Sequence, residues 1–223
     1  MRKVSQWLAI LFVTAVTGSA MAAATVETVK VKDQSLLASF SDNSNGACGA
    51  GTISSSVDVQ WNSSLIKSDG TTMIQSAILV SVNYVNLCTG DELTMSGFIG
   101  GANGSVATDL ASGHVDAVVP VMTMPDPDTG SFVSGTVKLS LNFTATGSAT
   151  TIRNRSHSRD GGVITISNFT TSSRPAVATG TCTATLPLIG GPTTVDLLGG
   201  QQSFSAQIGK DANGNLTIIT NAH

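Results

Sequence analysis

Charge is scarce in this sequence, and basic charge is scarcest. Charged residues occupy 11% of the 223 positions, with 11 lysine and arginine residues against 14 aspartate and glutamate residues. Proteins that bind nucleic acids in general need a broad basic surface that neutralises phosphates. The composition therefore excludes general nucleic-acid binding. Hydrophobic residues make up 41% of the chain, which is enough to build a core and excludes general disorder.

Long hydrophobic runs are missing beyond the N-terminus. No later stretch approaches the roughly 20 apolar residues that cross a bilayer as a helix, so no membrane span is predicted. The opening stretch MRKVSQWLAILFVTAVTGSAMAAA places two basic residues before a short apolar run and then small residues. This order is typical of a secretory signal peptide. We predict a signal peptide over residues 1–22, with cleavage after Ala22 or Ala24, and secretion to the periplasm, the cell surface or the extracellular medium.

Helical periodicity is nearly absent, whereas alternation with a period of two is frequent. Apolar and polar side chains alternate along residues 74–85 and 137–144, which is typical of strands with one face in a core. Asp-Gly and Asn-Gly dipeptides between such segments favour tight hairpin turns. The expected strands are 25–32, 53–61, 74–85, 93–100, 114–122, 137–146, 163–169, 176–186, 203–209 and 215–220.

A succession of short strands and hairpin turns predicts an all-β fold. Two antiparallel sheets packed as a β-sandwich, immunoglobulin-like or similar, are the simplest arrangement of such strands. No linker, low-complexity tract or internal repeat divides the chain after the signal peptide. We therefore expect a single β-sandwich domain over residues 23–223, a size at which one core is common.

Cysteine is rare, with three residues in the chain. Export to an oxidising compartment favours one disulfide bond and leaves one thiol over. The sequence allows three pairings. We favour Cys48 with Cys88, because each flanks an apparent strand end where loops can bring the two together. Cys182 alternates with apolar residues on a predicted strand, which indicates a small buried thiol.

Motifs of known catalytic and metal sites are lacking. The S-x-x-K and S-D-N elements of penicillin-binding enzymes occur at residues 64–67 and 41–43, but their order is reversed and no K-T-G follows. Zinc needs at least three converging ligands, and the three histidines, His114, His157 and His223, are too scattered to supply them. We therefore predict no catalytic residue, no metal and no cofactor.

All four arginines that follow the predicted signal peptide lie close together in the sequence. Three of them fall in TIRNRSHSRDGG, residues 151–162, which we expect to be a loop between the strands 137–146 and 163–169. Guanidinium groups bind phosphate, sulfate and carboxylate groups bidentately, so an anionic glycan or cell-surface polymer is a candidate partner. A solvated connector without a ligand is the alternative interpretation. The candidate anion-binding residues are Arg153, Arg155, His157, Arg159 and Arg174.

Several short motifs follow one another in an order that resembles a group of exported bacterial all-β proteins with no assigned activity. The motifs are GACGAG, NLCTGDEL, KLSLNFTATG, RNRSHS and SNFTTSSRPAVATGT. Phe143 stands where this group has a tryptophan. The resemblance implies an exported all-β fold and also supports pairing Cys48 with Cys88, but it implies no activity.

These features predict a non-catalytic exported bacterial protein, either a binding module or a surface-structural module. Two alternatives remain open. An adhesive, fimbrial-like subunit would assemble by pairing of edge strands, although this chain ends in Asn-Ala-His and lacks the penultimate tyrosine of pilus subunits. A hydrolase would need a cleft that holds His114 or His157 beside a carboxylate.

Overall fold

The computed structural model describes residues 24–46 and 48–220, so the predicted signal peptide and His223 lie outside the described part. The described residues form strands and turns, and they contain no helix long and apolar enough to cross a membrane. Every pair of neighbouring strands is antiparallel, which confirms the expected all-β antiparallel fold. The strands are β1 (Thr25–Gly46), β2 (Gly49–Ser68), β3 (Thr71–Asn86), β4 (Asp91–Gly100), β5 (Asn103–Val106), β6 (Ser112–Thr123), β7 (Ser134–Ala145), β8 (Thr150–Asp160), β9 (Val163–Leu188), β10 (Gly191–Asp196) and β11 (Ser205–Thr220).

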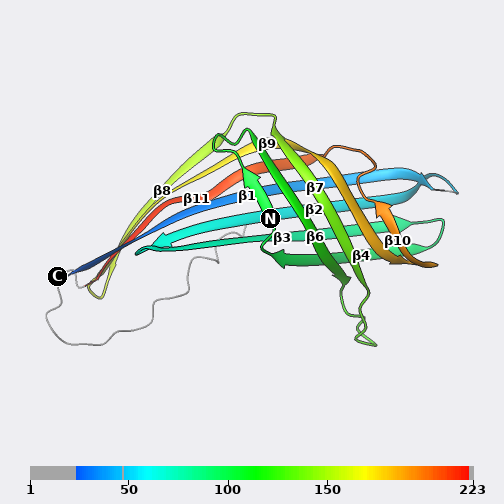
Figure 1. Ribbon diagram of the computed structural model, residues 1–223, viewed down its shortest axis with the longest axis horizontal. Coiled ribbons are helices and arrows are strands. Elements are labelled where there is room, and N and C mark those ends of the chain that lie inside the picture. The colour runs from blue at the N-terminus through cyan, green and yellow to red at the C-terminus, as the bar shows by residue number, and fades with distance from the viewer. Residues whose placement is uncertain (1–23, 47, 221–223) are drawn as a thin grey trace.

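These strands belong to one sheet that closes on itself. Its main path runs β10-β9-β11-β1-β2-β3-β4-β6-β5, and β7 closes it because β7 pairs with both β6 and β9. The strand β9 pairs with β11 along residues 164–176 and with β7 along residues 176–185. The closure lays β6 and β7 across β1, β2 and β3, so that the sheet forms two layers (Figure 1). Side chains from both layers share one core, as in a sandwich.

One face of each strand lines this core. In β7 the four alternate apolar side chains at positions 137, 139, 141 and 143 are all buried, as their pattern predicts. Burial of such a side chain contributes about 1.5–3 kcal/mol each to stability. The core is confined to the closed part of the sheet. Its largest fully buried side chains are Trp61, Phe40, Phe143, Leu36, Ile78, Met95, Leu141, Leu186, Leu197, Leu198, Ile208 and Val57.

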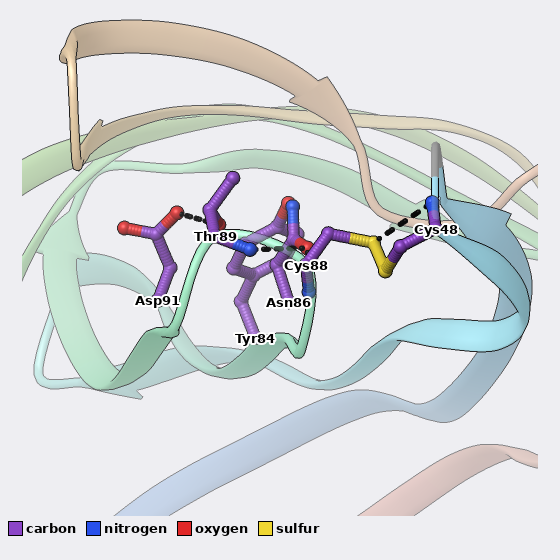
Figure 2. The surroundings of a disulfide bond; sticks show 6 residues. All are labelled: Cys48, Tyr84, Asn86, Cys88, Thr89 and Asp91. Atoms are coloured by element: carbon purple, nitrogen blue, oxygen red, sulfur yellow. Dashed lines mark hydrogen bonds between the residues drawn. A yellow bond between two sulfur atoms is a disulfide. The ribbon is translucent and has the colours of Figure 1, made fainter.

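A disulfide bond joins Cys48 and Cys88, which confirms the expected pairing. Their Cα atoms lie 5.6 Å apart, and the bond closes the end of the β2–β3 hairpin that lies opposite its turn. The adjoining β3–β4 turn is held by Asn86, whose side-chain oxygen accepts from the Cys88 N–H at 3.0 Å (Figure 2). Asp91 accepts from the Thr89 hydroxyl and, at 2.6 Å, from the N–H of Ile189 in the β9–β10 turn. The disulfide end of the molecule is therefore tied together by several neighbouring turns.

The third cysteine, Cys182, is a free thiol in the core. Burial, together with the nearby Asp196 carboxylate, raises the pKa of this thiol to about 12. A thiol that stays protonated is a poor nucleophile. Cys182 therefore has the character of a small apolar side chain, as its sequence pattern indicates.

Five strands continue past the core and form, together with β8, an open sheet that we call the extension. It consists of residues 25–32 of β1, 63–68 of β2, 71–76 of β3, 150–160 of β8, 163–174 of β9 and 213–220 of β11. Figure 1 shows these strands tapering together beyond β6 and β7. None of the described side chains in the extension is buried, because no second layer covers it there. Its edges are β8 and residues 71–76 of β3, since β4 pairs with β3 only from Ala77 onward.

The prediction of a loop over residues 151–162 is wrong. Residues 150–160 form β8, an edge strand that pairs with β9 along its whole length. Several strands are also longer than expected. The strand β9 merges the predicted 163–169 and 176–186, and β11 merges the predicted 203–209 and 215–220. The strands β1 and β2 extend well beyond the predicted 25–32 and 53–61. Hydrogen bonding to a neighbouring strand on each side of β9 overrides the weak strand propensity of its Thr-, Ser- and Pro-containing middle.

A half-buried acid marks the base of the extension. Asp33 lies beside a β-bulge between β1 and β11, and its Oδ1 has no hydrogen-bond partner among the described residues. Burial raises the pKa of this carboxyl; a hydrogen bond from Ser64 opposes the rise and the Asp211 carboxylate adds to it. The folded state therefore binds more protons than the unfolded state between the ordinary pKa and the raised one. In that window the free energy of unfolding falls as the pH rises.

We expect Asp33→Asn to raise the melting temperature at neutral pH, because it removes a poorly solvated charge. The gain disappears at about pH 3, where the carboxyl is protonated in both states. Thermal unfolding at the two pH values measures this difference, and Asp58→Asn, which removes an exposed carboxylate, is the matched control. A lower melting temperature of Asp33→Asn at neutral pH would contradict the prediction.

Candidate functional site

The basic segment, residues 150–160, forms the strand β8, and this fixes the directions of its side chains. Successive side chains of a strand point to opposite faces, so Arg153, Arg155, His157 and Arg159 share one face of β8. Each lies about 7 Å from the next, the length of two residues in a strand. All eleven residues of β8 are exposed. The four predicted anion-binding residues of this segment therefore form a row of exposed cationic and imidazole groups.

The register of β8 with β9 shows which face of the sheet carries this row. Arg153 pairs with Thr170 and Arg155 with Asn168, and even-numbered residues of β9 line the core farther along the strand, as Ala178 does. The row thus lies on the face that continues the core face into the extension. Arg174, the fifth predicted residue, lies on the same face at the base of the extension, where its Nε donates to the Gly147 carbonyl at 2.6 Å.

Three lysines that the sequence analysis did not single out lie on this face as well. Lys30 and Lys67 are direct cross-strand partners on β1 and β2, and Lys32 is two residues along β1. The cross-strand row through Arg155 continues over β9 and β11 to Lys30 and Lys67. Lysines that are far from the arginines in the sequence thus share one surface with them, which we call the basic face. Its positive residues are Lys30, Lys32, Lys67, Arg153, Arg155, Arg159, Arg174 and Lys210.

The charges of the extension are separated between its two faces. The register places Glu27 of β1 and Asp160 of β8 on the face opposite the basic one. Asp33 pairs with Ser64 and also faces away from the lysines. No aspartate or glutamate occupies a register position on the basic face of the described extension, and no lysine or arginine occupies one on the other face. Lys138 of β7 is the remaining basic residue of the described chain and lies outside the extension.

A shallow hollow lies at one side of the basic face. It has a volume of about 240 Å³ and is lined by Lys30, Lys67 and the threonines Thr28 and Thr72, together with the β2–β3 turn, which contributes the acidic Asp69. Lys30 and Lys67 are directly opposite each other in the ladder. Two like charges in this position destabilise a strand pair, and an anion in the hollow would relieve that repulsion.

His114 does lie beside a carboxylate, but without the geometry of a hydrolase site. Its Nε2 is 2.5 Å from Asp116 Oδ2 and its Nδ1 is 2.9 Å from Asn142 Oδ1. The hydrogen bond to Asp116 is the main cause that raises the pKa of His114. Both ring nitrogens face oxygens, so neither is placed to take a proton from a serine hydroxyl. The two side chains are 40% and 52% exposed on an open strand face, so no cleft encloses them.

Comparison with known proteins does not identify a family for this chain. The chain matches no protein-family model and no curated protein among those searched. Its function is therefore inferred from its own residues. In the described part no group of three histidine, cysteine, aspartate or glutamate side chains converges as a metal site would require, and the basic face is the most distinctive surface there.

Proposed function

We propose that this chain is an exported, non-catalytic bacterial binding module that binds anionic polymers through its basic face. The separation of charge in the extension carries the proposal, because all the described lysines and arginines of its strands occupy register positions on one face, and the described aspartate and glutamate residues of these strands occupy the other. The predicted signal peptide and the Cys48–Cys88 disulfide support export, since disulfides persist in oxidising compartments. An anionic glycan or another cell-surface polymer is the expected partner.

A protein with a formal net charge of −3 can still attract an anion locally. At physiological ionic strength charges act over about 8 Å, so the acidic residues elsewhere contribute little to the potential at the basic face. Arg153 and Arg155 are about 7 Å apart and reinforce each other over this distance. Guanidinium groups also form paired hydrogen bonds with carboxylate and sulfate groups, which adds geometric preference to charge.

Binding to polygalacturonate, dextran sulfate and neutral dextran over a salt series tests this function. The exported protein is expected to bind the two anionic polymers and not the neutral one, with affinity that falls as salt rises. The variant Arg153→Gln/Arg155→Gln/Arg159→Gln is expected to bind at least about 100-fold more weakly, because each charged contact contributes about 1.5–3 kcal/mol.

Single-charge variants provide the control. Arg155→Gln and Lys138→Gln change the net charge equally, but only the first lies on the basic face. Equal effects of the two variants, or equal binding of all three polymers, would contradict the proposal. Melting temperatures of the variants verify that each is folded.

A second candidate function, assembly by edge-strand pairing, is favoured by the free edges of the extension. Among the described residues, β8 and residues 71–75 of β3 each have a neighbouring strand on one side only. Pairing of β8 with a second β8 would bring arginine rows together, so β8 would pair with the β3 edge of another copy. Sedimentation over a range of protein concentrations distinguishes the two functions: oligomers that grow with concentration and no anion binding would support assembly instead.

A further inference from the structure

Two basic stripes run along the strands of the basic face. The first consists of Arg153, Arg155, His157 and Arg159 on β8. The second consists of the three lysines on β1 and β2. The strands β9 and β11 separate the stripes, so β8 and β1 lie three strand spacings, about 14 Å, apart. Arginine and lysine side chains are long enough to lean over this gap from both sides.

The strip between the stripes is uncharged. Beside Arg153 and Arg155 it is polar, with Asn168 and Thr170 on β9 and Asn213 and Asn215 on β11. Beside His157 and Arg159 it is largely apolar and presents Ile166, Ile164, Thr217 and Ile219. Amide and hydroxyl groups both donate and accept hydrogen bonds. The polar part of the strip suits a ligand that carries hydroxyl groups along its middle and acidic groups at its sides.

The aromatic residues needed to bind a single-stranded nucleic acid are missing from this surface. Nucleic acids without secondary structure are held by stacking of their bases on aromatic side chains as well as by charge. No phenylalanine, tyrosine or tryptophan occupies a described register position on the basic face of the extension, and Phe169 lies on the opposite face. The chemistry of the face therefore favours a polyanion that is rich in hydroxyl groups.

We infer that the basic face binds one chain of a linear acidic polysaccharide, which lies along β9 and β11 between the two stripes. The inference rests on the proposed function and specifies its ligand. Sugar hydroxyls contact the strip of Asn and Thr side chains, and acidic groups contact the arginines on one side and the lysines on the other. One acidic group of the ligand lies in the hollow beside Lys30 and Lys67, whose ammonium groups belong to directly paired residues of β1 and β2.

Isothermal titration with galacturonate oligosaccharides of defined length, and with polyphosphate of matched charge, tests the inference on the exported protein. Affinity is expected to rise with oligosaccharide length until the chain spans the row from Arg153 to Arg159, about 20 Å, and then to level off. Lys30→Gln/Lys67→Gln is expected to bind the longer oligosaccharides about tenfold more weakly. Its melting temperature should be unchanged or higher, because like-charge repulsion is removed.

A second double variant separates sugar recognition from charge. Asn168→Ala/Asn215→Ala should weaken oligosaccharide binding about fivefold or more and leave polyphosphate binding unchanged, because it removes hydrogen bonds but no charge. If it weakens neither ligand, or if polyphosphate binds as tightly as the oligosaccharides, the polysaccharide assignment is overturned while anion binding stands. If no anionic polymer binds at all, the proposed function itself fails.

Discussion

Replacement of Trp61 by alanine is expected to lower the free energy of unfolding by about 3–5 kcal/mol. Trp61 is 1% exposed and is the largest fully buried side chain. It lies on the core face of β2 between Leu36 of β1 and Ile78 of β3. Its indole N–H donates to the Ala102 carbonyl at 3.2 Å. The substitution therefore leaves a large cavity and a buried carbonyl without its partner, and both effects destabilise the fold.

Urea unfolding of Trp61→Ala measures this loss of stability. A substitution at Gly104 tests whether the loss comes from the packing of the indole ring. A Cβ atom added at Gly104 would lie 2.5 Å from the Trp61 indole. Gly104→Ala should therefore cost about 1–3 kcal/mol in the natural sequence, and far less in the Trp61→Ala background, where the space is open. A Trp61→Ala loss below about 1 kcal/mol, or equal costs of Gly104→Ala in both backgrounds, would contradict this packing.

Loss of the Cys48–Cys88 disulfide is expected to cost about 4 kcal/mol of stability. The bond closes a segment with a sequence separation of 40 residues, and the cost follows from the extra conformational freedom that the unfolded chain gains without it. The variant Cys48→Ala/Cys88→Ala removes the bond. Because the cysteines lie in turns outside the core, we expect the variant to keep its strands and to unfold at lower denaturant concentration.

A reducing agent gives an independent measurement of the same effect. It should lower the stability of the natural protein and of Cys182→Ala to a similar extent, since Cys182 is a free thiol. It should leave the double cysteine variant unchanged. If the reducing agent affects the double variant, or if the double variant is as stable as the natural protein, the bond does not stabilise the fold in this way.

Alternation along the sequence predicts the core strands well, but it does not predict where the core ends. In β3 the residues Ile78, Val80, Val82 and Tyr84 are buried as expected. Ile74 continues the same pattern and is 70% exposed, because it lies in the extension, where no second layer covers the sheet. A local pattern identifies the face of a strand, whereas burial of that face depends on distant strands such as β6 and β7.

The candidate site was also predicted only in part, because local patterns do not show which distant strands are neighbours. The spacing of Arg153, Arg155, His157 and Arg159 is itself a period of two, so the row on β8 was available as a signal. Its charged and small polar residues have weak strand propensity, which favoured a loop. The contribution of Lys30 and Lys67 could not be found in this way, because only the register of β11, β1 and β2 places them opposite the arginines.

Five strands run from the closed part into the extension as continuous elements: β1, β2, β3, β9 and β11. The backbone beneath the basic face is therefore ordered when the protein folds, before any ligand arrives. Binding would restrict only the exposed arginine and lysine side chains, at a cost of about 0.5–1.5 kcal/mol for each one immobilised. A binding site on a flexible connector would also have to order its backbone when the ligand binds. The basic face avoids this entropic cost.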